Sequence, residues 1–140
     1  MRGNVIVDAG PLVALLERRG RHHEWAKQHF SSLEPPLLTC EAVLAEACHL
    51  VRRLPDGIPS VLEALSRGLL VIALDLERES QAVAQLVTRY QEVPMSLADA
   101  CLVRMSELHS ESIVMTLDSD FRIYRQHGRR VIRTITPDRT

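Results

Sequence analysis

The chain has 140 residues, of which 46% are hydrophobic and 25% are charged, and its formal net charge is −1. This length and composition predict one soluble globular domain over residues 1–140. They exclude an overall basic field that would attract nucleic acid, and the three cysteines are too few and too irregularly spaced for a disulfide framework.

The N-terminal half alternates short apolar strands with helices. The run N-V-I-V-D at 4–8 is typical of a buried parallel strand, and a helix with Pro11 in its first turn follows to about Arg19. Asp8, Gly10 and Pro11 interrupt the apolar stretch that would otherwise mimic a signal peptide. A second helix is predicted over 22–33, a very short strand over 37–39, and a helix over 40–53 that Thr39 caps.

The C-terminal half continues the alternation. A turn rich in proline and glycine at 55–59 precedes a helix that ends at Gly68, a strand over 69–74 and an amphipathic helix over 76–90. Pro94 and Ser96 open another helix, and strands are predicted over 112–117 and 130–135 with a short helix around 121–127 between them. This order predicts an α/β fold, with helices on both faces of a parallel sheet and the carboxyl ends of its strands at one edge.

Four acidic residues stand out by their positions. Asp8 and Asp118 directly follow predicted strands, where an aspartate is often only a turn or capping residue. Glu46 borders an apolar stripe in the middle of a helix, although its side chain could reach solvent. Asp99 lies within S-L-A-D-A-C-L-V, where Ser96 and Asp99 also fit a capping box.

A bound divalent cation would explain all four acids together. Magnesium and manganese prefer carboxylate oxygen and water, and such a site suits hydrolysis of phosphodiesters. The catalytic and metal-binding residues predicted in this way are Asp8, Glu46, Asp99 and Asp118. Asp120 either assists them or caps the next helix, and Thr116 and Ser119 could supply neighbouring hydroxyls.

At this point the sequence resembles the PIN-domain ribonucleases, in particular VapC-like toxins of toxin–antitoxin pairs. The four acids lie in order within V-I-V-D-A-G-P-L, T-C-E-A-V-L-A-E-A-C-H-L, M-S-L-A-D-A-C-L-V and T-L-D-S-D-F. The resemblance implies a three-layer α/β/α sandwich around a parallel sheet of about five strands. It also implies Mg²⁺- or Mn²⁺-dependent cleavage of RNA, a homodimer and a cognate antitoxin. Many members have Ser or Thr after the first acid, where this chain has Ala9.

Some alternatives remain open. The acids could be structural in a catalytically silent PIN-fold module that binds RNA or protein. Cys40, Cys48 and His49 could in principle bind zinc, although their spacing fits no finger pattern. The late arginines could line a phosphate path or form a solvated face; these are Arg122, Arg125, Arg129, Arg130 and Arg133. Tyr90, Phe121 and Tyr124 are the candidates for stacking on RNA bases, and of these Phe121 is favoured as a core residue. The sequence also favours a cytoplasmic location without a membrane span.

Overall fold

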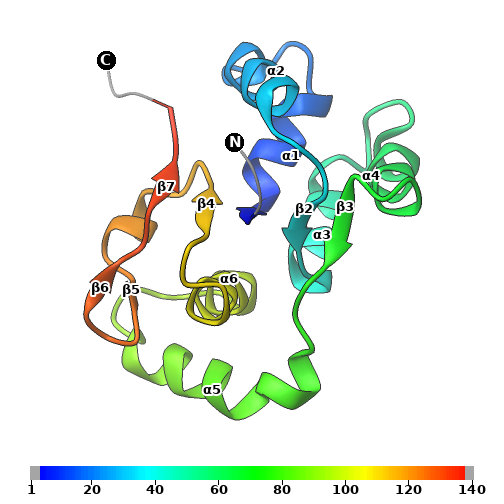
Figure 1. The fold of residues 1–140 in the computed structure, drawn as a ribbon. Coiled ribbons are helices and arrows are strands. Elements are labelled where there is room, and N and C mark those ends of the chain that lie inside the picture. The colour runs from blue at the N-terminus through cyan, green and yellow to red at the C-terminus, as the bar shows by residue number, and fades with distance from the viewer. Residues whose placement is uncertain (1–3, 138–140) are drawn as a thin grey trace.

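A five-stranded parallel β-sheet organises the chain, and the computed structural model describes residues 4–137 (Figure 1). The strand order is β3-β2-β1-β4-β7, and every neighbouring pair is parallel. Their bounds are β1 (Val5–Val7), β2 (Leu37–Thr39), β3 (Leu70–Ile72), β4 (Ile113–Met115) and β7 (Thr134–Ile135). The predicted sheet is therefore confirmed, and Asp8 and Asp118 both follow strands that end at the same edge.

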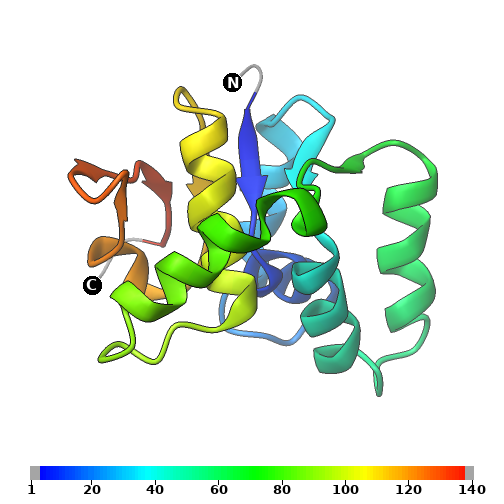
Figure 2. The ribbon, with the colours of Figure 1, turned by 90° about the horizontal axis from the view of Figure 1, so that it is seen from below.

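Helices cover the sheet on both sides. Their bounds are α1 (Ala9–Leu16), α2 (His23–Ser32), α3 (Glu41–Leu50), α4 (Gly57–Ser66), α5 (Leu76–Arg89) and α6 (Leu97–Leu108). α1 and α2 lie on the opposite side of the sheet from α5 and α6, and α4 lies beside the edge strand β3 (Figures 1 and 2). This arrangement confirms the predicted α/β class. Within residues 4–137, no helix is both long and apolar enough to cross a membrane.

The core consists mainly of Val, Leu, Ile and Ala side chains from β1, β4 and α6, as the scarcity of aromatic residues predicts. Two aromatic residues nevertheless belong to it, because Phe121 and Tyr124 are among the largest fully buried side chains. Their rings pack edge to face with centroids 5.1 Å apart. The prediction that Tyr124 could stack on an RNA base is therefore wrong.

The region after β4 differs most from the prediction. A short 3-10 helix, η1 (Ser119–Arg122), replaces the helix expected around 121–127. The strand expected over 130–135 is divided in two: β6 (Arg130–Val131) pairs antiparallel with β5 (Arg125–Gln126), whereas β7 joins the main sheet. The αL conformations of His127 and Gly128 at the hairpin turn allow this separate two-stranded ribbon.

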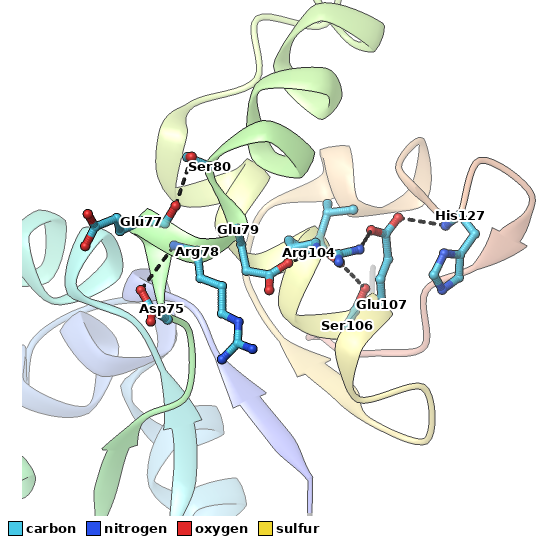
Figure 3. A network of polar contacts seen from close by, with 10 residues as sticks. Asp75, Glu77, Arg78, Glu79, Ser80, Arg104, Ser106, Glu107 and His127 are labelled. Atoms are coloured by element: carbon cyan, nitrogen blue, oxygen red, sulfur yellow. Dashed lines mark hydrogen bonds and ion pairs between the residues drawn. The ribbon is translucent and has the colours of Figure 1, made fainter.

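A polar chain holds α6 in place from both sides (Figure 3). The Arg104 guanidinium on α6 donates to Glu79 on α5 at 2.7 Å and to Glu107 on α6 at 3.1 Å. The second carboxylate oxygen of Glu107 accepts the backbone N–H of His127 at 2.7 Å, which attaches the hairpin to the same helix. Because these carboxylates are largely shielded from solvent, the contacts fix α6 better than an exposed surface pair would.

Candidate active site

Asp8 is the most buried of the four acids, with 6% of its surface exposed. It ends β1 and caps α1, and its Oδ1 accepts the Ala9 N–H at 2.7 Å. Its Oδ2 accepts the Thr116 hydroxyl, also at 2.7 Å. The capping interpretation of Asp8 is thus correct, but capping accounts for only one of its two oxygens.

Thr116 joins two of the predicted acids. Its buried hydroxyl donates to Asp8 and accepts the backbone N–H of Asp118 at 2.9 Å. Asp118 in turn caps η1, since its Oδ1 accepts the Asp120 N–H at 2.9 Å. The predicted capping role of Asp120 is therefore wrong, because the short helix begins earlier and Asp118 is its cap.

Asp99 forms the predicted capping box and also faces the other acids. Its N–H donates to Ser96 Oγ at 3.0 Å, and the Ser96 N–H donates to Asp99 Oδ2 at 3.4 Å. The Tyr124 hydroxyl donates to the same Oδ2 at 3.1 Å. Within the described residues, Oδ1 accepts no hydrogen bond. One oxygen is therefore held by the protein while the other is available to a ligand.

Glu46 occupies an exposed position on α3 and forms no hydrogen bond or ion pair with the residues at 4–137. This agrees with the interpretation that its side chain reaches solvent. Its pKa is nevertheless raised, first by desolvation and then by the charges of Asp99 and Asp118. Glu46 is therefore near enough to Asp99 and Asp118 for their charges to act on its carboxyl. Thr39, predicted to cap α3, belongs to β2, and Cys40 occupies the cap position.

The acids influence one another electrostatically. Burial raises the pKa of Asp8 to about 6, and the charges of Asp99 and Glu46 add to the increase against two opposing hydrogen bonds. Burial and the charge of Asp118 likewise raise the pKa of Asp99. The largest contributions to these pKa values include no basic side chain. Such a group of carboxylates, drawn from four segments, carries excess negative charge that a cation would stabilise.

The donor set suits a hard divalent cation, although the ligand geometry is not complete. Between residues 4 and 137, no three His, Cys, Asp or Glu side chains converge closely enough to hold a metal ion. Carboxylate oxygens without protein donors are the ligands that Mg²⁺ and Mn²⁺ prefer. The residues fit such an ion chemically, and rotation of the exposed Glu46 side chain is the simplest way to complete its coordination.

Tyr124 is a polar neighbour of the acids that the sequence did not assign to them. Burial and the charge of Asp99 raise the pKa of its hydroxyl, so it stays a hydrogen-bond donor. No local pattern could have identified it, because the contact joins residues 25 positions apart across a turn of unpredicted shape. Asp120 is near enough for its charge to act on the same hydroxyl, whereas Ser119 is exposed at the rim.

Replacing Tyr124 with Phe should lower activity more than stability. The substitution keeps the buried ring and removes only the donor to Asp99, so we expect a loss of about tenfold in the RNA cleavage that the sequence resemblance implies and about 1 kcal/mol in the free energy of unfolding. Tyr90→Phe is the matched control, because Tyr90 packs against Tyr124 and accepts the Arg125 N–H without a hydrogen bond to Asp99. Equal cleavage by both variants would show that the Tyr124 hydroxyl does not position Asp99.

Comparisons with known proteins agree with this fold and with the resemblance seen in the sequence. The model of the PIN domain family matches residues 5–126. The chain is 28% identical to ribonuclease VapC26 of Mycobacterium tuberculosis over 116 residues, which cover 81% of this chain and 86% of that protein.

A solved structure gives the same result for the architecture. The crystal structure of M. tuberculosis VapC20, a toxin that cleaves the sarcin-ricin loop, superposes with a TM-score of 0.73. The superposition covers 83% of this chain and 91% of VapC20 at 20% sequence identity, so it supports the fold alone. Because the family model spans most of the sequence, including all four predicted acids, the chain belongs to the PIN domain family.

Proposed function

We propose that this protein is a VapC-type ribonuclease that hydrolyses RNA phosphodiester bonds with Mg²⁺ or Mn²⁺. The observation that carries the proposal is the placement of Asp8 and Asp118 at one edge of the sheet, where the Thr116 hydroxyl joins them, with the charges of Asp99 and Glu46 acting on Asp8. The likeness to ribonuclease VapC26 supports the same activity. A purely structural role would leave the shared negative charge unexplained, because clustered like charges destabilise a fold.

The chain's own residues orient the carboxylates. Ala9 N–H and the Thr116 hydroxyl fix both oxygens of Asp8, and Ser96 N–H with the Tyr124 hydroxyl fix Oδ2 of Asp99. Asp8, Asp99, Asp118 and Glu46 are the residues that would hold the ion. When bound, it would neutralise the scissile phosphate and lower the pKa of a water molecule for attack. Burial of Asp8 keeps bulk water from screening this charge.

The test is cleavage of RNA by the purified protein beside its Asp99→Asn variant. Wild type should cut a structured RNA pool with Mn²⁺ and stop when EDTA is added, and Asp99→Asn should not cut under either condition. The amide keeps the shape of Asp99 and its contact with Tyr124, so loss of cleavage would report loss of charge rather than unfolding. Equal cleavage by both proteins would contradict the proposal, and binding of RNA without cleavage would identify a silent binding module.

Metal binding should also appear as thermal stabilisation. Protein stripped with EDTA should melt at a lower temperature than the same protein with Mn²⁺, because a ligand that binds only the folded state stabilises it by about 2.7 kcal/mol at a hundredfold excess over Kd. This corresponds to a rise of roughly 5 to 10 °C for a chain of this size. Calorimetry with Mn²⁺ and then with Ca²⁺ measures the effect, and an unchanged melting temperature would exclude the site.

The likeness to VapC proteins extends the proposal to partners and location. We also propose a cognate antitoxin and a homodimer, which the resemblance to VapC-like toxins implies, and a cytoplasmic location. Co-expression with the protein encoded beside it and light scattering of the purified chain would measure the first two. RNA remains the proposed substrate, and its cleavage sequence would come from sequencing the 3′ ends that the protein generates in cells.

A further inference from the structure

An open groove of about 530 Å³ begins at the acidic site and extends along the β7 side of the sheet. Thr116 and Asp118 belong to its wall and also to the site described above. Its other polar lining comes from three segments, the loop before α2, η1 and β7 with the residue after it: Arg21, His22, Ser119, Arg122, Thr134 and Thr136. Leu117, Phe121 and Pro137 complete the wall. Its volume is in the range of pockets that bind small organic ligands, and one nucleotide is such a ligand in size.

The charge of this groove is opposite to that of the acidic site. Arg21 and Arg122 both line it and are exposed, and neither side chain forms a hydrogen bond or ion pair within the described part of the chain. They come from segments about a hundred residues apart, so their presence in one groove is a product of the fold rather than of a local charge run. An unpaired guanidinium has five N–H donors in a planar fork that matches phosphate geometry.

Two of the other late arginines donate to backbone carbonyl oxygens instead of lining the groove. The Arg125 guanidinium donates to the carbonyl oxygens of Arg122, Ile123 and Tyr124, at 2.5, 3.1 and 3.0 Å. Arg133 donates to the Glu111 carbonyl at 3.1 Å. Arg129 and Arg130 lie on the hairpin of β5 and β6 and do not line the groove. Of the five late arginines, Arg122 alone lines it, and Arg21, which the sequence did not single out, joins it from the N-terminal part of the chain.

An RNA strand fits these features better than an acidic protein segment. A phosphodiester at the carboxylates has neighbouring phosphates on the same strand, and a groove that starts at Asp118 is where the next of them would lie. The hydroxyls of Ser119, Thr134 and Thr136 could bond to phosphate oxygen or to the 2′-OH of ribose. An acidic protein segment in this groove would instead place its own carboxylates beside Asp118, where like charges repel.

We propose that this groove binds the phosphate next to the scissile phosphodiester, with Arg21 and Arg122 as its ligands. The inference rests on the proposed ribonuclease function and identifies the chain's own substrate-positioning residues. In this proposal the two arginines bind the RNA strand, whereas the carboxylates take part in hydrolysis of the phosphodiester. RNA affinity and its salt dependence should therefore depend on both side chains.

The experiment measures binding of a short, fluorescently labelled single-stranded RNA to the non-cleaving Asp99→Asn protein. Arg21→Ala and Arg122→Ala on that background should each weaken binding by about three- to tenfold at low salt. Each should also flatten the slope of log Kd against log salt by about 0.7, the value for one lost phosphate contact on a single strand. The double substitution should flatten it by about 1.4.

Arg67→Ala is the matched control. Arg67 is the C-cap of α4 just before β3 begins, so it lies toward the amino ends of the strands, away from the acids. Among the described residues, its side chain forms one ion pair, a 3.9 Å contact with the exposed Glu63. It should leave Kd and the salt slope unchanged. The groove proposal would be overturned if Arg21→Ala, Arg122→Ala and Arg67→Ala gave the same Kd and the same salt slope. It would also be overturned if the double arginine variant bound RNA as tightly as the Asp99→Asn protein.

The two proposals fail separately. If wild-type protein does not cut RNA but the arginine substitutions still flatten the salt slope, the groove holds and the ribonuclease function fails. If wild type cuts RNA while the arginine variants bind like Arg67→Ala, the groove fails and the ribonuclease function holds. Melting curves should be unchanged in the arginine variants, because neither side chain has a protein partner in the described structure.

Discussion

Replacing Asp8 with Asn should abolish RNA cleavage and at the same time stabilise the metal-free protein at neutral pH. Loss of a predicted metal ligand should cost more than the ten- to hundredfold typical of residues that only support ligands, so we expect cleavage to fall by at least about a hundredfold. The variant should also lose the thermal stabilisation that Mn²⁺ gives wild type.

The stabilisation follows from the pKa of Asp8. Its carboxyl has an ordinary value of 3.8 in the unfolded chain and about 6 in the fold, chiefly because of burial. Between these values the folded state keeps a proton that the unfolded state releases, so stability falls as the pH rises. Above pH 6 the ionised carboxyl costs about 3 kcal/mol. A neutral amide avoids this cost but pairs less well with the Thr116 hydroxyl, at about 1 kcal/mol.

The net gain of about 2 kcal/mol should appear in urea unfolding with EDTA, measured from pH 4 to pH 8. Wild type should lose stability over the lower half of this range, and Asp8→Asn should not. Asp75→Asn provides the control, because Asp75 also caps a helix, where it accepts the Arg78 N–H at 3.2 Å, but lies exposed. A wild-type profile that rises across this range would contradict the assigned direction.

Gly57→Ala should be among the most destabilising single substitutions in the chain. Gly57 opens α4, and a Cβ added to it would lie 2.1 Å from the backbone oxygen of Val51. Because this neighbour is a backbone carbonyl beside a fully buried valine, it cannot rotate away as a side chain would. We expect a loss of at least about 3 kcal/mol in the free energy of unfolding, the upper range for overpacking.

Gly68→Ala separates crowding from backbone strain. Gly68 has a φ of +77° and no atom within 4 Å of an added Cβ, so only its left-handed conformation opposes a side chain. That variant should lose about 1 kcal/mol. Chemical denaturation of both proteins with EDTA present tests the comparison. A smaller loss for Gly57→Ala than for Gly68→Ala would mean that the turn between α3 and α4 opens easily.

Local patterns were sufficient to predict most of the sheet. The β-branched run at 4–8 could form only a buried strand, and the capping box at Ser96 and Asp99 fixed the start of α6, which the structure confirms. Alternation of strands and helices then brought Asp8 and Asp118 to one edge, because parallel strands share a direction. Asp8 and Asp118 could therefore be placed together although they are far apart in the sequence.

The C-terminal region resisted prediction for a physical reason. Residues 130–135 have one continuous β propensity, but a hairpin turn at His127 and Gly128 uses the first part and the sheet uses the last. The choice depends on tertiary partners such as Glu107, which accepts the His127 N–H. The sequence likewise could not predict a role for Arg21, since only the fold brings it to the same groove as Arg122.

The hydrogen bond between Thr116 and Asp8 spans 108 positions, and β4 lies between β1 and β7 in the sheet. During translation, β1 can pair with β2 early, but its other neighbour, β4, is made only after most of the polypeptide. A nascent chain has no Asp118 and no hydroxyl to hold Asp8 in place. The acidic edge is therefore complete only after β4 and η1 have been synthesised.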